Sequence, residues 1–530
     1  MELDKTATTE KNTPLNPQRE GSQNVKIPLP LGIKGCVGCS PRESLPIVHI
    51  QSRKGTTNMG AKEVILDYIN DQDEKLSYIA REIWVHPQIA LEETFASALL
   101  AKELEQDGFS IEWGAGQMPT AFIATWGEGS PIIGFLGEYD ALPGLSQTVS
   151  TKKESIVAGG PGHGCGHNLY GTSCMASVMG LKRAMEQEDI KGTIRFYGCP
   201  AEETLVGKTF MARDGVFDDL DAAISWHPGS TNIVWNGSSL ALNSFKVNFH
   251  GVAAHAGGAP HLGRSALDGV MLMDMGVNYL REHIIQEARI HSVVTSGGLA
   301  PNVVPAYAQV WYFVRAPRRD QVDEIYARVL DIAKGAALMS GTTYDIEFIT
   351  GCYDVLPNKT LSDLLLEKMQ EADGITFTEQ ERAFAKELQA TFPAGSVQRS
   401  FDWMEKSASS GIAPEDIDNP LWEQVLPHSE TPPLMGGSTE VGDVSWITAT
   451  GQITTTCWPL GTPGHSWQTV VSSGSSIGSK GMIFAAKGMA LAGYDLFTKP
   501  DLLAQAKAEF IAARKGKEYV TPLPEGSTPK

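Results

Sequence analysis

The chain has 530 residues, of which 42% are hydrophobic, 20% charged and 8% aromatic, which excludes disorder, collagen and coiled coil for its bulk. Its 62 acidic residues outnumber 43 basic ones, and a net charge of -19 disfavours nucleic acid and membrane surfaces as partners. Seven scattered cysteines and the lack of a long apolar run predict a cytoplasmic protein without a disulfide scaffold, signal peptide or membrane span.

Residues 1–58 are polar and rich in Pro and Gly, and we interpret them as a flexible extension because they lack any sustained period. Cys36 and Cys39 form a CxxC pair there. No second cysteine pair or histidine pair at zinc-finger spacing accompanies them, which favours two free thiols over a metal site.

From residue 61 the apolar positions recur at spacings of three and four, which predicts helix with a break at the acidic turn 71–74. A second helix is expected at about 93–107, and another at about 168–187. Apolar bursts of strand length lie at 121–126, 131–136, 193–198 and 222–226. Short buried strands that alternate with helices predict an α/β fold with a mostly parallel sheet flanked by helices.

The segment 242–351 has the order strand, helix, strand, strand, helix, strand, which is typical of a ferredoxin-like βαββαβ domain. We expect it to be a compact domain inserted into a first domain, whose two parts are 59–241 and 352–515, with a tail at 516–530. Within the second part, the polar stretch at about 385–435 fits neither pattern. A helical stretch from about 480 to 515 closes that part.

Polar side chains follow the predicted strands, where ligands gather in open α/β sheets. The residues after the strand bursts include Asp140, Glu202, Glu203 and His227, and the Gly-rich run GHGCGHN at 162–168 adds Cys165 and His167. This mixture of thiolate, imidazole and carboxylate suits a pair of divalent cations. A buried cysteine in a Gly-rich turn, or a solvated acidic pair at a helix start, would explain single residues but not the whole set.

Glu202 and Glu203 are adjacent, and in an extended segment their side chains would point in opposite directions. We therefore expect one carboxylate to bind metal and the other to accept a proton from the attacking water. His465, in the turn GTPGHSWQ at 461–468, could supply a closing ligand. His255 lies in a small-residue loop of the inserted segment, where a ligand or partner surface would have room.

A series of segments between about 60 and 500 resembles, in matching order, the two-metal aminoacylase/carboxypeptidase family of amidohydrolases. The segments are REIWVHPQIALEE (81–93), GEYDALPGL (137–145), GHGCGHN (162–168), CPAEE (199–203), WHPG (226–229), HAGGAPHLGRSALDG (255–269), GGLAPNVVP (297–305), GSTEVGDVSW (437–446) and GTPGHSWQ (461–468). The chain departs from the broader subgroup at Glu138 and Asn168, where an aspartate is usual.

The resemblance implies a zinc-peptidase-like catalytic domain with two divalent ions per chain. Thiolate and imidazole suit zinc, and the carboxylates also permit manganese or cobalt. It implies Glu202 as the general base and Asp140 as an acidic residue behind the metals. The metal ligands that it implies are Cys165 as the bridging ligand, His167, Glu203, His227 and His465.

On the inserted segment, His255 resembles a residue that polarises the scissile carbonyl, often from the neighbouring subunit. Asn302 and Arg315 resemble groups that bind the substrate's carboxylate end. Because the net charge of -19 repels an anionic substrate, binding needs a local positive centre formed by the metals and Arg315. The resemblance further implies that 242–351 is a lid and that 59–241 and 352–515 are the two parts of the catalytic domain. It also implies a homodimer through the lid, with a related second subunit as the alternative.

The expected reaction is metal-dependent hydrolysis of the amide bond of an N-aroyl or N-acyl amino acid that carries a free carboxylate. The substrate we expect is p-aminobenzoyl-glutamate, which would give p-aminobenzoate and glutamate. A general N-acyl amino acid deacylase and a dipeptidase are alternatives within the same chemistry. A weakly active partner subunit of a two-chain hydrolase is the alternative from another class, although the intact Glu202 and ligand set disfavour it.

Overall fold

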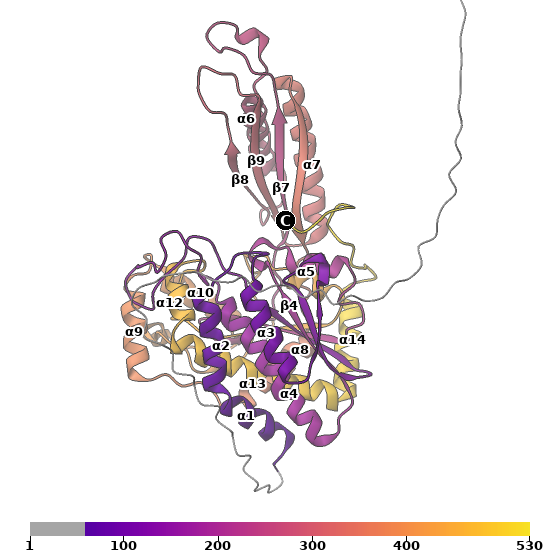
Figure 1. The fold of residues 1–530 in the computed structure, drawn as a ribbon, viewed down its shortest axis with the longest axis vertical. Helices are drawn as coiled ribbons and strands as arrows, with labels where there is room; N and C mark the ends of the chain where they lie inside the picture. Colours follow the sequence, from indigo (N-terminus) through magenta and orange to yellow (C-terminus); the bar gives the residue numbers. More distant parts are fainter. Residues whose placement is uncertain (1–58) are drawn as a thin grey trace, which may run out of the picture. The chain divides into compact units, whose positions relative to one another are not determined.

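Two β-sheets form the framework of residues 59–530, the part of the chain that the computed structural model describes (Figure 1). The predicted extension and the Cys36/Cys39 pair lie outside the described residues. The larger sheet has eight strands, in the spatial order β1 (Ser110–Trp113), β2 (Phe122–Glu128), β4 (Gly192–Cys199), β3 (Ile132–Glu138), β5 (Ala222–Gly229), β12 (Thr450–Thr456), β6 (Asn232–Val234) and β11 (Val425–Leu426).

The central strands β4, β3, β5 and β12 of this sheet are parallel, whereas β1, β2 and β6 each pair in the antiparallel direction with a neighbour. Each apolar burst predicted from the sequence is a strand: β2, β3, β4 and β5. The threonine-rich β12 and the short β1, β6 and β11 were not predicted, because they lack a run of large apolar residues.

Both faces of the larger sheet are buried, as alternate residues show. Phe135 and Phe196 pack into one core with α4 (His167–Glu188) and α13 (Ser476–Thr498). Their neighbours Leu136 and Tyr197 pack into a second core, with α5 (Gly207–Arg213) and α11 (Val441–Ser445). Successive side chains of a strand point to opposite faces, so each central strand contributes to both cores.

Further helices surround this sheet, and the predicted helical regions are all present. The break expected at 71–74 separates α1 from α2. The helical stretch expected from about 480 to 515 contains two helices, because Pro500 begins a new one. The remaining helices are α1 (Ala61–Asp71), α2 (Asp73–Val85), α3 (Thr94–Gln106), α8 (Lys359–Glu371), α9 (Glu379–Gln389), α10 (Ser396–Ser407), α12 (Trp467–Ser473) and α14 (Pro500–Ala513).

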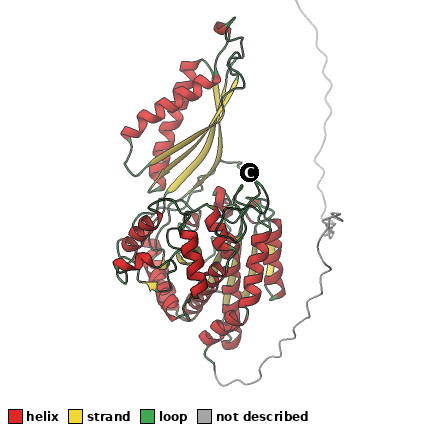
Figure 2. Cartoon of the chain, turned by 90° about the vertical axis from the view of Figure 1, so that its left-hand side faces the viewer, coloured by secondary structure: helices red, strands yellow, loops and turns green. Residues whose placement is uncertain are grey.

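The smaller sheet has the predicted βαββαβ order and the spatial order β10-β7-β9-β8 with antiparallel pairing throughout. Helices α6 and α7 cover one face of it (Figure 2), where their apolar residues form a separate core. The elements are β7 (Ala241–His250), α6 (Ala266–Leu280), β8 (Arg289–Ser296), β9 (Tyr307–Ala316), α7 (Arg319–Ser340) and β10 (Thr343–Cys352).

Strand β9 shows how the two faces of the smaller sheet differ. Val310, Tyr312 and Val314 are buried under the helices, whereas Trp311, Phe313 and Arg315, which alternate with them, are only partly buried and point to the other face. This alternation is the period of a half-buried strand. No helix within residues 59–530 combines the length and the apolar character needed to cross a membrane.

Candidate metal centre and substrate cavity

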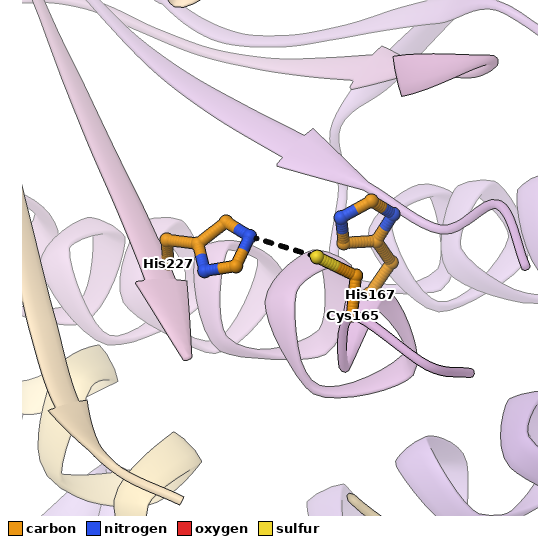
Figure 3. Close-up of side chains that lie close together, drawn as sticks. All are labelled: Cys165, His167 and His227. Carbon is orange, nitrogen blue, oxygen red and sulfur yellow. Dashed lines mark hydrogen bonds between the residues drawn. The ribbon is translucent and has the colours of Figure 1, made fainter. Parts of the chain in front are cut away.

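Cys165, His167 and His227 converge at the carboxyl end of the central strands (Figure 3). Cys165 and His167 flank the start of α4, and Gly166 between them has φ 74, a left-handed conformation that glycine adopts readily. His227 lies in β5, and its Nε2 atom is 3.4 Å from Cys165 Sγ. One donor atom from each of the three residues lies within 4.8 Å of the others.

Cys165 also belongs to a second triad, with Glu203 and His465. Nε2 of His465 is 3.3 Å from Oε2 of Glu203. The backbone N–H of His465 donates to the carbonyl of Gly164, 3.2 Å away, which ties the turn before α12 to the Gly-rich loop. The structure thus brings together all five residues predicted as metal ligands, with Cys165 common to both triads.

A third cluster contains Glu138, His167 and Glu202. Nε2 of His167 is 3.2 Å from Glu138 Oε2 and 3.8 Å from Glu202 Oε2. Sequence reasoning did not include Glu138 among the site residues. The signal that could have indicated Glu138 is its residue type. The resembled family usually has an aspartate at this position, and the glutamate places a longer carboxylate at the end of β3.

The donor set has the character of a divalent-cation site. His167 Nε2 and Glu138 Oε2 are 3.2 Å apart but do not form a hydrogen bond, and these two atoms and Glu203 Oε1 are buried without a hydrogen-bond partner among the described residues. Buried polar atoms are normally hydrogen-bonded, so unpaired ones converging from several elements indicate a bound group. Thiolate, imidazole and carboxylate are the ligands that zinc and related ions take, and the residues present therefore fit such ions.

Asp140 orients the centre from behind. Its Oδ1 is 2.8 Å from Nδ1 of His167, and its Oδ2 accepts a hydrogen bond of 2.9 Å from the backbone N–H of Glu203. A carboxylate on Nδ1 leaves Nε2 of the imidazole free for a cation. Burial disfavours both charged forms, but each partner stabilises the other, so the pKa of Asp140 is lowered and that of His167 is raised well above its usual value.

Glu202 and Glu203 lie in a short 3₁₀ turn, Glu202–Thr204, so the expected extended backbone at this pair is wrong. The left-handed conformation of Ala201, φ 56, turns the chain sharply after β4. The two carboxylates still separate, because Glu203 faces Cys165 and His465 whereas Glu202 faces Glu138 and His167. Burial raises the pKa of Glu202 well above its usual value and that of Glu203 to about 8.

Lys208 of α5 is a buried cation directly behind this centre. Its Nζ atom is 2.7 Å from Glu138 Oε1 and 3.5 Å from Glu440 Oε1, and all three side chains are at most 1% exposed. Burial disfavours the ammonium, but Glu138 and Glu440 raise the pKa of Lys208 well above its usual value. Sequence reasoning missed this triad, since the residue type of a single lysine in a short helix gives no sign that its ammonium group is buried and paired.

A cavity of about 880 Å³ opens from the centre toward the smaller sheet. This volume lies within the range of small-molecule sites. Strands β7, β9 and β10 contribute its upper wall through Ser244, Trp311, Arg315 and Glu347. The aromatic lining consists of Trp235, Trp311, Phe313, Trp403 and Trp458.

Arg315 brings positive charge into this cavity. Its Nη1 donates to Ser438 Oγ over 3.2 Å, and its buried Nε has no hydrogen-bond partner among residues 59–530. No described carboxylate forms an ion pair with it, and burial lowers its pKa. An unneutralised guanidinium in a cavity wall is suited to binding an anion.

His255 and Asn302 lie together, but away from the cavity lining of this chain. Both are exposed. The backbone N–H of Ala256 donates to the carbonyl of Asn302 over 3.0 Å, and His255 Nδ1 accepts from the N–H groups of Gly257 and Gly258. The structure therefore does not bring these two predicted residues to the metal centre within one chain.

Comparisons with known proteins identify relatives of this chain. The peptidase dimerisation domain family matches residues 241–338. The chain is 42% identical to the B subunit of the p-aminobenzoyl-glutamate hydrolase of Escherichia coli, over 87% of this chain and 97% of that protein. It is 31% identical to the Xaa-Arg dipeptidase of Mus musculus, over 61% of this chain and 75% of that protein.

The fold matches a solved structure, the YxeP protein of Bacillus subtilis, described as a dinuclear metal-binding peptidase of the M20 family. The TM-score is 0.51 at 17% identity, with 81% of this chain and 99% of that chain covered. Three findings support membership of the same family: the sequence identity over nearly the full length of the bacterial hydrolase chain, the matching dimerisation domain and the fold. The chain therefore belongs to the two-metal aminoacylase/carboxypeptidase family of amidohydrolases, the M20 peptidases, and is a hydrolase of carbon–nitrogen amide bonds.

Proposed function

We propose that this chain hydrolyses the amide bond of an N-aroyl or N-acyl amino acid, with p-aminobenzoyl-glutamate as its substrate. The observation that carries the proposal is the position of Glu202 beside two donor triads that share Cys165, in one cavity with the unneutralised Arg315. The relative with 42% identity is named for the same substrate, which supports the choice of acyl group and amino acid.

Two divalent ions would be held by this centre, zinc or manganese, with cobalt also compatible with the donors. His167 and His227 would ligate one ion each, Glu203 and His465 would complete the set, and Cys165 would bridge. When bound, the ions would polarise the scissile carbonyl and lower the pKa of the attacking water to about 7.

Glu202 would perform the proton transfers. Its carboxylate takes one proton from the water as the water oxygen attacks the carbonyl carbon, and returns that proton to the nitrogen as the C–N bond breaks. Aminobenzoate and glutamate would leave as products. Asp140 holds His167 through Nδ1 and Glu203 through its backbone N–H, so it keeps the ligands in place without touching the reacting atoms.

Arg315 would bind the carboxylate end of the substrate, because its guanidinium lines the cavity without an acidic partner among the described residues. His255 and Asn302 lie on the proposed lid, 242–351, between the proposed catalytic parts 59–241 and 352–515. Because these two residues are exposed and remote from this chain's cavity, we propose that they complete the site of a second copy in a homodimer, or of a related second subunit. His255 would polarise the carbonyl there, and Asn302 would contact the carboxylate end.

A dipeptidase is the second candidate function, favoured by the 31% identical Xaa-Arg dipeptidase. Both candidates use the same centre and differ in the amide that the cavity accepts. A general N-acyl amino acid deacylase would accept small acyl groups as well. The aromatic cavity lining favours an aromatic acyl group over these alternatives.

The test is to purify the chain alone, determine its metal content by elemental analysis, and measure hydrolysis of p-aminobenzoyl-glutamate, acylated amino acids and dipeptides. We expect about two ions per chain and the highest kcat/KM on p-aminobenzoyl-glutamate. Faster turnover of a dipeptide would favour the second candidate. A chain that holds metal but hydrolyses none of these amides would instead be a weakly active partner subunit, and the proposal would fail.

A further inference from the structure

Gln452 and Trp235 form a pair of unpaired polar groups in the wall of the cavity. Gln452 lies in β12 and the residue is only 5% exposed, and Trp235 directly follows β6. Oε1 of Gln452 and Nε1 of Trp235 are both buried, and neither has a hydrogen-bond partner in the described part of the chain. The backbone N–H of Trp235 donates to the carbonyl of Gln452 over 2.9 Å, which holds the two residues side by side.

Unpaired buried groups of this kind are unusual. A buried donor or acceptor that lacks a partner is costly enough that nearly all such groups in folded proteins are hydrogen-bonded. Gln147 shows the ordinary situation, since it is equally buried but its amide bonds to Lys152 and Glu154. The acceptor of Gln452 and the donor of Trp235 instead border a cavity, where a ligand can satisfy them.

The sheet register places this pair relative to the metal centre. Thr454 of β12 is opposite His227 of β5, and Gln452 is opposite Ser225. Gln452 and Thr454 are two residues apart and therefore project from the same face of the sheet, where both line the cavity. Gln452 therefore lies about 6.6 Å along β12 from Thr454, the residue opposite the proposed metal ligand His227. This separation is comparable with the length of a para-substituted benzoyl group.

We propose that Gln452 and Trp235 determine specificity for the acyl half of the substrate, by hydrogen bonding to a polar substituent at the far end of an aromatic acyl group. Gln452 Oε1 accepts from the N–H or O–H of an amino or hydroxyl substituent, and Trp235 Nε1 donates toward its lone pair. The inference rests on the proposed function, because it assigns one half of the same substrate. Arg315 binds the other half, so the two ends are recognised by different chemistry.

The experiment compares p-aminobenzoyl-glutamate with benzoyl-glutamate, which lacks only the amino group, on the metal-loaded enzyme. We expect the wild type to prefer the amino substrate by about tenfold to a hundredfold in kcat/KM, since the unsubstituted ring leaves both groups unpaired. In Gln452→Leu the ratio of the two kcat/KM values should fall close to one, mainly because kcat/KM for p-aminobenzoyl-glutamate decreases. Trp235→Phe removes only the N–H and should lower the ratio severalfold.

Gln147→Leu is the matched control, because it removes a buried glutamine that is bonded within the protein, and its ratio should equal that of the wild type. Equilibrium binding of p-aminobenzoate and benzoate, measured by calorimetry, gives a readout that does not depend on turnover. Hydrolysis of both substrates with a ratio that neither Gln452→Leu nor Trp235→Phe changes would overturn the inference and leave the proposed function intact.

The converse result separates the two proposals. If neither amide is hydrolysed but p-aminobenzoate binds the wild type more tightly than benzoate does, and Gln452→Leu abolishes the difference, the proposed function fails and the specificity assignment stands. Absence of both hydrolysis and selective binding would overturn both. Trp235→Phe keeps the test decisive if Gln452→Leu does not fold.

Discussion

Replacement of Arg315 by methionine tests the proposed recognition of the substrate's carboxylate end. The substitution keeps an apolar stem of similar length but removes the only guanidinium described in the cavity lining. Arg315 has a buried Nε without a partner, and no described acidic residue neutralises it. The substitution breaks no internal ion pair and only one internal hydrogen bond, the one to Ser438 Oγ, so most of its effect on binding should come from the lost contact with the substrate.

The magnitude follows from the burial of the group. Truncating one partner of a buried, hydrogen-bonded charge pair costs about 2–5 kcal/mol. Arg315 is only partly buried, so water screens part of the interaction, and we take the lower end of this range. A loss of about 2–3 kcal/mol corresponds to a rise in KM for p-aminobenzoyl-glutamate of roughly 30- to 150-fold.

The assay measures kcat and KM on p-aminobenzoyl-glutamate and on its α-amide, which has no α-carboxylate. The wild type should discriminate strongly between the two, and Arg315→Met should bring their KM values together. Arg318→Met is the control, because this exposed arginine pairs with Asp320 and does not line the cavity. An equal loss on both substrates, or an unchanged KM on the glutamate substrate, would refute the role of Arg315.

Three single substitutions and one double variant test the centre itself. Glu202→Gln should keep its metal content in elemental analysis but lose about 10²–10⁴-fold in kcat, and retained turnover would assign the base elsewhere. Cys165→Ser should lose metal in equilibrium dialysis, because a hydroxyl is not ionised at neutral pH as a metal-bound thiol is; unchanged stoichiometry would remove Cys165 from the ligands. Lys208→Met should lower the free energy of unfolding by about 3–5 kcal/mol in a urea titration, because it leaves buried carboxylates without their cation. The double variant Lys208→Met/Glu440→Gln should recover part of the lost free energy of unfolding. An unchanged free energy of unfolding in Lys208→Met would contradict the ion triad.

The local sequence was enough to predict most of the framework. Apolar bursts indicated strands β2 to β5, and the order of elements indicated the βαββαβ fold of the smaller sheet, because these patterns depend only on neighbouring residues. The same reasoning failed for β12, whose threonines lack the signal of a buried strand, although its partners on both sides make it central. Its register with β5 is what places Gln452 in the cavity.

The five proposed metal ligands could be expected to meet because each lies at the end of a strand, directly after one, or in a Gly-containing turn, where a short motif fixes both residue type and place in the fold. The sequence by itself determined the donor types and the edge of the sheet at which they meet. Only the tertiary structure decided how they group into triads around Cys165, and that Lys208 is buried while Arg315 has no acidic partner among the described residues. These properties depend on distances between segments far apart in the chain and on the exclusion of water, and neither is encoded in a local pattern.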